Sequence, residues 1–347
     1  MLLFTRSKKT PRQELAMGKN NGKASRKEQI LKPIGFGSPS RSGPHNASEV
    51  VALGDSRLLF CDNNIGDALL ELRLAPDGSM ACPLIERPLQ GVEAGVIDDI
   101  EGIALIENAG RKYIFALPSL SLKQRKKKRK KKSKQGKTAA PRSVLLRILI
   151  CEDDQLQPEM IPDFRPWLIE RAPELGKAHK YLPDSGGLNI EALAWDPVNQ
   201  ALLLGVRTPV SEGKPLILRV RLEEIDGPWT LDNLGMLPAI TLQPEDVGEE
   251  QGIRAMEYDP SRNAFLIVMG NSTSGSKAPF SLYSWDGNSE GIVRRFKQIR
   301  FHKKMKVEGV THGTIDGRGA VLFVDDAGGY QFLWDDDPRL SLTNDER

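Results

Sequence analysis

From Ile30 onward, apolar residues occur in short runs separated by Gly, Pro, Asn and Asp. The runs are four to eight residues long and rich in Val, Ile, Leu and aromatic residues, which is typical of β-strands. Only residues 155–180 have the length for a helix, and prolines interrupt them at Pro158, Pro162, Pro166 and Pro173. The pattern therefore predicts an all-β chain.

The predicted strands recur in units. The first strand of each unit carries a charged residue at its third position: ASEVVAL (47–53), DIEGIAL (99–105), NIEALAW (189–195), GIRAMEY (252–258) and KVEGVTH (306–312). A second and a third apolar run follow each of them. Three or four antiparallel strands that recur roughly every 50 residues are the signature of a β-propeller.

The number of blades is predicted as five or six. Five units are visible, and a degenerate sixth has room in residues 155–187. The last unit ends near Asp335 with three strands, so we expect residues 26–36 to supply its outer strand and to close the ring, which removes free sheet edges. A pair of β-sandwiches is the structural alternative, but it does not explain a charge in register in every unit.

The charges divide the chain into parts. The total is +3, but residues 123–137 hold 11 basic residues and no acid, and residues 1–30 hold 8 basic and 2 acidic residues. Subtracting these +11 and +6 leaves −14 on the rest, which excludes a protein that coats nucleic acid with a basic surface. We expect a disordered basic tail over 1–29, a propeller over 30–337 and a C-terminal tail over 338–347.

The lysine run lies between the second and third strands of the second unit, in a predicted loop insertion over 121–141. Such a run cannot pack and binds polyanions, such as nucleic acid or anionic lipid, without specificity. No aromatic residue interrupts it, so sequence readout by base stacking is not expected. The alternative is a solvated loop with no dedicated partner.

The charged positions are the candidate site. In a propeller the first strand of each blade lines the central channel, so Glu49, Glu101, Glu191, Arg254 and Glu308 are expected to converge there. Three interpretations stay open: a structural ion network, a bound Ca²⁺ and direct catalysis by a channel glutamate. Further candidates for ligand or metal contacts are Asp62, Asp99, Asn189 and Arg207, the last binding an anion together with Arg254.

Other signals are few. Cys61, Cys82 and Cys151 have no metal or disulfide spacing and are predicted to be buried thiols in a reducing compartment. The opening MLLFTRSKK has only four consecutive apolar residues, which predicts neither a signal peptide nor a transmembrane segment. A cytoplasmic monomer is therefore expected.

Over about residues 45–335 the chain resembles a bacterial domain-of-unknown-function family with β-propeller repeats. The most specific motifs are GGLNIE with the following GVRTP, and GIR followed by an acidic residue. The Ile-Glu-Gly/Ala motif is also similar, more weakly, to esterase-like phytase and lactonase-type propellers. The resemblance implies that recurrent motif positions are Glu101, Asn189, Glu191, Arg207, Arg254 and Glu308.

Two functions are predicted. The first is a metal-assisted hydrolase of phosphate esters, carboxylic esters or lactones, with Ca²⁺ as the Lewis acid. Its catalytic residues would be Glu101, Glu191 and Glu308, its ligand-binding residues Arg207, Arg254 and Asn189, and its metal ligands Glu101, Glu191 and Asp62. The alternative is a non-catalytic binding or scaffold protein whose lysine-rich loop contacts polyanions.

Overall fold

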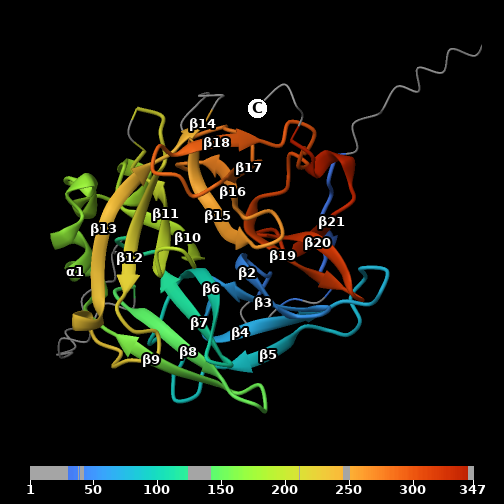
Figure 1. The fold of residues 1–347 in the computed structure, drawn as a ribbon, viewed down its shortest axis with the longest axis horizontal. Helices are drawn as coiled ribbons and strands as arrows, with labels where there is room; N and C mark the ends of the chain where they lie inside the picture. The colour runs from blue at the N-terminus through green and yellow to red at the C-terminus, as the bar shows by residue number, and fades with distance from the viewer. Residues whose placement is uncertain are drawn as a thin grey trace, which may run out of the picture.

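The computed structural model describes residues 30–37, 39, 43–123, 142–210, 212–244 and 251–342. Five antiparallel sheets stand around one axis as the blades of a β-propeller (Figure 1). The predicted all-β propeller is confirmed, and the number of blades is five.

In each blade the strands follow one another along the chain from the axis outward, with two exceptions at the outer edge: the fourth blade has a short strand that precedes its inner strand, and the last blade takes its outer strand from the N-terminal side. Blade 1 contains β2 (Ala47–Gly54), β3 (Arg57–Asp62), β4 (Ile65–Arg73) and β5 (Ile85–Pro88). Blade 2 contains β6 (Ile100–Asn108), β7 (Arg111–Pro118), β8 (Leu145–Ile150) and β9 (Leu156–Ile161). Blade 3 contains β10 (Asn189–Asp196), β11 (Ala201–Thr208), β12 (Leu216–Leu222) and β13 (Leu234–Thr241). Blade 4 contains β15 (Gln251–Asp259), β16 (Ala264–Asn271), β17 (Ser281–Trp285) and β18 (Ile292–Arg295), with β14 (Gln243–Pro244) parallel to β18. Blade 5 contains β19 (Val307–Ile315), β20 (Arg318–Asp325), β21 (Gly329–Trp334) and β1 (Ile34–Gly35).

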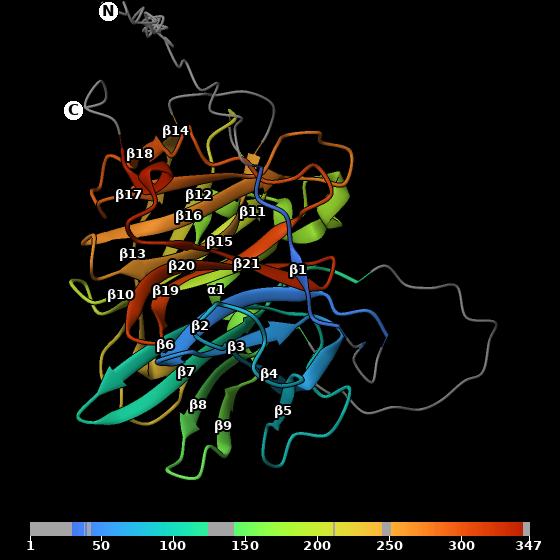
Figure 2. The same cartoon turned by 90° about the vertical axis from the view of Figure 1, so that its right-hand side faces the viewer.

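The ring is closed by β1. This strand pairs with β21 through Ile34 opposite Tyr330 and Gly35 opposite Gly329, and it runs along the rim of the last blade (Figure 2). The expected closure by residues 26–36 is thus borne out by the part of that segment that the structure describes. The early strand covers the edge of β21, which would otherwise expose unpaired backbone groups.

The core lies between the blades. Five clusters of buried apolar side chains each join two neighbouring blades, as in the cluster of Phe60, Leu322 and Tyr330 between blades 1 and 5. A strand between two blades buries one face against each neighbour, so both faces are apolar and the sequence is an almost continuous apolar run. Near the axis the strands approach closely: a Cβ on Gly102 of β6 would lie 2.7 Å from the Cβ of Leu193 on β10.

No sixth blade exists in residues 155–187. After β9 the chain forms α1 (Phe164–Arg171) and the short 3₁₀ helices η1 (Pro173–Leu175), η2 (Ala178–Lys180) and η3 (Pro183–Ser185). The prolines leave too few backbone N–H groups for a sheet, and buried Phe164, Trp167 and Leu168 pack on the core between blades 2 and 3. Two further 3₁₀ helices, η4 (Leu231–Asn233) and η5 (Pro338–Leu340), complete the list of elements.

The inner strand of every blade runs in the same direction along the axis, so all five inner strands begin at the same face of the propeller. We call this face the mouth face. The connections β7–β8 and β9–β10 lie on this face as well. No helix among the described residues is long and apolar enough to cross a membrane. Cys61 is buried as expected, whereas Cys82 and Cys151 are only partly buried.

Candidate functional site

Every inner strand has a β-bulge near the mouth face. The register of the inner pair shifts at Ile100/Gly102, Ile190/Ala192, Ile253/Ala255 and Val307/Gly309, and between Ala47 and Val50. In four blades the residue left unpaired is the charged one: Glu101, Glu191, Arg254 and Glu308. Bulges of this kind re-aim one side chain while the strand continues, and they are frequent beside active sites. In these four blades the recurring charged residue therefore lies at the same β-bulge of the inner strand.

Arg254 joins the acids of both neighbouring strands. Its Nε lies 2.9 Å from Oε2 of Glu191, and its Nη2 forms an ion pair with Oε1 of Glu308. Its Nη1 donates to the carbonyl oxygen of Asn271 over 3.3 Å. Only 3% of Arg254 is exposed. Burial lowers the pKa of Arg254 to about 10, although Glu191 opposes the shift, so the guanidinium stays charged at neutral pH.

Glu191 is held by two hydrogen-bond donors in addition to its ion pair with Arg254. Its Oε1 accepts a hydrogen bond of 2.7 Å from Nδ2 of Asn189 and one of 2.5 Å from Nη1 of Arg207. Arg207 is fixed in turn, because its Nε donates to the carbonyl oxygen of Ser272 over 3.0 Å. The structure thus brings together five of the predicted residues: Asn189, Glu191, Arg207, Arg254 and Glu308.

Glu101 is bonded differently. Its Oε2 accepts a hydrogen bond of 2.8 Å from Oγ of Ser48, and no arginine forms an ion pair with it among the residues that the structure describes. Burial raises the pKa of Glu101 well above its ordinary value, and the negative charges of Asp99 and Glu191 add to the shift. The protonated carboxylic acid is therefore favoured. Together, Glu101, Glu191, Arg254 and Glu308 form what we call the carboxylate ring.

Glu49 does not belong to this ring, and the predicted alignment is corrected here. Counting from the paired residues on both sides of the bulge, Ser48 occupies the position of Glu101, and Glu49 occupies that of Gly102. The Glu49 carboxylate accepts backbone N–H groups of Met256 at 2.9 Å and Val310 at 3.1 Å. Its side chain therefore crosses the axis and ties β2 to β15 and β19. Burial raises the pKa of Glu49, against the effect of these hydrogen bonds.

The sequence pattern did not predict a role for Ser48, although it contains a relevant signal. The residue after the bulge is small in the other four blades, since it is Gly102, Ala192, Ala255 or Gly309. Blade 1 has Glu49 at this position, so Glu49 is the exception to a pattern of small residues, and that exception was the available signal.

Most of the oxygens proposed for a metal are engaged by protein donors, and Oε1 of Glu101 is the exception among the described residues. Oδ2 of Asp62 lies 3.1 Å from Nδ1 of His45, and its Oδ1 accepts the N–H of Asn64 over 3.0 Å. Asp99 is paired with Nη1 of Arg142 at 2.7 Å. Within the described ranges, no three His, Cys, Asp or Glu side chains are grouped so that they could hold a metal ion. The donor set does not fit Ca²⁺, because arginines already neutralise Glu191. Calcium binding stays a prediction.

The predicted polyanion contact falls mostly outside the described residues. Of the lysine run over 123–137, the structure describes Lys123 alone. Its Nζ lies 2.8 Å from Oδ2 of Asp98, which also pairs with Arg142 at the far end of the insertion. Binding of nucleic acid or anionic lipid stays a prediction.

Fold and site together define a five-bladed β-propeller with a ring of buried charges at one end of its axis. Residues 170–319 match the family model described as "Protein of unknown function (DUF3616)", which confirms the resemblance to a domain-of-unknown-function family. No curated protein matches the chain.

Solved structures are similar to this chain at the level of the fold. The allergen Mala s 1 of Malassezia sympodialis has a TM-score of 0.45 at 10% identity, with 88% of this chain and 94% of that chain covered. Glutaminyl cyclase of Myxococcus xanthus has a TM-score of 0.42 at 12% identity, with 88% and 99% covered. A GH43_1 enzyme of Xanthomonas citri complexed with xylose has a TM-score of 0.47 at 7% identity, with 88% and 90% covered. At these scores, the function of this chain has to be argued from its own residues.

Proposed function

We propose that the protein hydrolyses a small carboxylic ester or lactone by acid–base chemistry at the carboxylate ring. The observation that carries this proposal is the contrast between two carboxyl groups of one ring. Glu101 has a raised pKa and a single serine donor, whereas Glu308 is paired with a guanidinium. Two carboxyl groups whose environments favour opposite protonation states are the usual basis of paired acid and base roles.

In this reaction Glu308 acts as the base. Its Oε1 is paired with Arg254, while its Oε2 makes no hydrogen bond with any residue that the structure describes. That oxygen can take a proton from water as the water oxygen attacks the carbonyl carbon. The bond from the carbonyl carbon to the alkoxy oxygen then breaks, and Glu101 gives its proton to the leaving oxygen. Acid and alcohol are the products, and proton exchange with water restores both glutamates.

Ser48, Glu191 and the two arginines act as positioning residues. The hydrogen bond from Ser48 holds Oε2 of Glu101, so that Oε1 is left to carry the transferred proton. Arg207 and Arg254 hold Glu191 between them, which links the bulge of β10 to the bulge of β15. No step uses a metal.

The charge balance of the site favours a carboxylic ester or lactone over a phosphate ester. Glu191 and Glu308 are opposed by Arg207 and Arg254, and a protonated Glu101 adds no charge. Phosphoryl transfer needs cations that are available to the transferred group. Both arginines are already committed to carboxylates.

The test is hydrolysis of p-nitrophenyl acetate, δ-valerolactone and p-nitrophenyl phosphate by the wild type and by Glu101→Gln. We expect turnover of the first two probes, and a loss of about 100- to 10,000-fold in kcat for Glu101→Gln. EDTA should leave the rate unchanged, whereas loss and recovery with Ca²⁺ would support the metal-assisted mechanism. The matched control is Glu71→Gln, a buried carboxylate on β4. Full activity of Glu101→Gln would contradict the proposal.

A second candidate is a non-catalytic binding or scaffold protein. It is favoured by the fact that Arg207 and Arg254 are compensated within the ring itself. A fully paired network makes a core rigid without any chemistry. This candidate requires that none of the three probes is turned over.

A further inference from the structure

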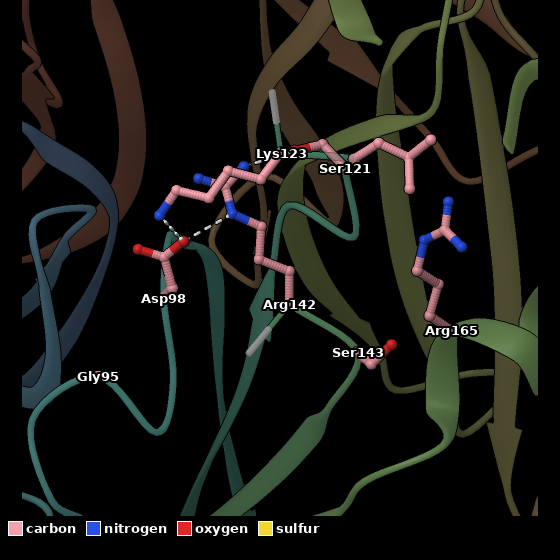
Figure 3. Close-up of a pocket in the computed structure, with 8 residues that line it drawn as sticks. Gly95, Asp98, Ser121, Lys123, Arg142, Ser143 and Arg165 are labelled. Atoms are coloured by element: carbon pink, nitrogen blue, oxygen red, sulfur yellow. Dashed lines mark hydrogen bonds and ion pairs between the residues drawn. The ribbon is translucent and has the colours of Figure 1, made fainter. Parts of the chain in front are cut away.

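A cavity of about 300 Å³ lies on the mouth face, where the chain enters β6 and leaves β7. It is lined by Gly95, Asp98, Ser121, Leu122, Lys123, Arg142, Ser143 and Arg165. Figure 3 shows Arg165 on one side of the cavity, and Lys123, Arg142 and Asp98 on the other, with Ser121 and Ser143 between them. Three cationic side chains thus share one small hollow with a single lining carboxylate.

Arg165 is the cation without a counter-ion. It lies in the first turn of α1, where its Nε donates to the carbonyl oxygen of Leu120 over 2.7 Å and its Nη2 to that of His179 over 2.9 Å. In the part of the chain that the structure describes, no carboxylate pairs with it, and burial lowers its pKa. A partly buried guanidinium held only by carbonyls keeps an uncompensated charge, and its Nη1 makes no hydrogen bond with any described residue.

The wall of the cavity opposite Arg165 also carries positive side chains, but carboxylates neutralise them. Oδ2 of Asp98 lies 2.8 Å from Nζ of Lys123 and 2.9 Å from Nε of Arg142. Nη1 of Arg142 pairs with Asp99 at 2.7 Å and donates to Oγ of Ser121 over 2.6 Å. Three cations against two carboxylates leave one positive charge in excess, and this excess belongs to Arg165.

We propose that this cavity binds a small organic oxyanion, a carboxylate or a phosphate monoester, through Arg165, with Lys123 and the hydroxyl of Ser143 as further donors. The exposed side chain of Leu122 gives an apolar surface for the body of the ligand. A guanidinium beside hydroxyl donors is the usual recognition pattern for such an anion. The inference does not rest on the proposed hydrolysis.

Isothermal titration with benzoate, phenyl phosphate and neutral benzyl alcohol tests the proposal. At least one anion should bind about tenfold or more tightly than benzyl alcohol, and Arg165→Gln should remove that difference. Binding of benzoate alone indicates a carboxylate ligand, and binding of phenyl phosphate alone indicates a phosphate monoester. Affinities of both anions equal to that of benzyl alcohol overturn the proposal.

The substitution Asp98→Asn gives the sharper readout, because it should strengthen binding. It removes the carboxylate that competes for Lys123 and Arg142, so anion affinity should rise severalfold, an effect that loss of structure cannot produce. The reverse change, Lys123→Gln, should weaken binding, and its side chain is 69% exposed, so folding should be unaffected. An unchanged or lower affinity of Asp98→Asn, with an unchanged melting temperature, overturns the proposal.

A matched pair elsewhere on the same face controls for general surface charge. Nζ of Lys306 lies 2.9 Å from Oδ2 of Asp326, and this lysine side chain is 61% exposed. Lys306→Gln and Asp326→Asn should leave the affinity for both anions unchanged. If they change affinity as Lys123→Gln and Asp98→Asn do, the anion is attracted by net charge and the cavity is not its site. Glu101→Gln should also bind normally, which separates this inference from the proposed chemistry.

Discussion

Glu71 in blade 1 and Glu101 in blade 2 are both buried glutamates, with 0% and 7% exposed. Oε1 of Glu71 accepts from Nε of Arg57 at 2.8 Å and from Nε of Arg73 at 2.7 Å, while its Oε2 pairs with Arg87 at 2.5 Å. Burial acts to raise the pKa of Glu71, but these hydrogen bonds outweigh it and lower the pKa to about 2. Glu101 has one serine donor, and its pKa is raised.

The difference teaches that cationic partners decide the state of a buried carboxyl group, and that topology decides which partners it meets. Arg57 and Arg87 stand on the neighbouring strands β3 and β5, and Arg73 lies on β4 with Glu71, so the Glu71 cluster is built within one sheet. The carboxylate ring is built from residues of different blades. A cluster within a blade stabilises that blade, whereas a ring between blades lies where a ligand can meet several of them.

The largest expected effect is a contrast between the two glutamate substitutions: one should lower kcat, and the other should lower the free energy of unfolding. Glu101→Gln should lower kcat by about 100- to 10,000-fold with little change in stability. Glu71→Gln should keep kcat and lower the free energy of unfolding by about 2 kcal/mol, since three partly exposed arginines lose a shared buried partner, although Arg57 and Arg87 keep Asp154. Steady-state kinetics and urea denaturation of the same samples measure both. Two variants with the same phenotype would break the comparison.

Arg254→Ala should have the largest effect on stability. Removing this arginine leaves Glu191 without one partner and Glu308 without its only described partner, in a buried setting, which costs about 3–5 kcal/mol. Urea denaturation measures the loss. A loss under about 1 kcal/mol would mean that the ring is solvated and open to a ligand, against the ion network described here.

The pH dependence of stability should have opposite signs at the two sites. The lowered pKa of Glu71 stabilises the fold above its unfolded value of 4.5, and this contribution is lost as the pH falls toward about 2. The raised pKa of Glu101 favours the fold below its unfolded value, and this contribution is lost as the pH rises through the folded value. The free energy of unfolding of Glu71→Gln should therefore approach that of the wild type at acid pH. That of Glu101→Gln should exceed the wild-type value at alkaline pH. Parallel stability curves would refute both assignments.

The smallest effect is expected for Arg73→Ala. Its side chain is 40% exposed, and Glu71 keeps Arg57 and Arg87, so the free energy of unfolding should change by less than about 1 kcal/mol. Thermal denaturation beside Arg254→Ala checks this. A loss as large as that of Arg254→Ala would show that the blade-1 cluster is as tightly coupled as the ring.

Much of the fold was predictable because local hydrophobic patterns and turn residues specify the strands. Short apolar runs with turns between them located the three inner strands of all five blades, and the three-stranded last unit required an outer strand from residues before Ala47. The outer strands of the other four blades were not located in this way. The sixth blade was ruled out by tertiary structure, since apolar residues of 164–175 serve as a cover on blades 2 and 3. Hydrophobic periodicity alone cannot distinguish such a covering segment from the irregular strands of a degenerate blade.

The sequence by itself determined that charges recur near the start of the inner strands, because a repeat brings equivalent positions to one axis. Only the tertiary structure decided that Ser48 takes the place of Glu49, since a bulge shifts the register by one residue and so exchanges the directions of side chains. It also decided that Arg254 neutralises Glu191 and Glu308 while Glu101 meets a serine. Those contacts join strands from different blades, so their effect on pKa depends on distances that no local pattern specifies.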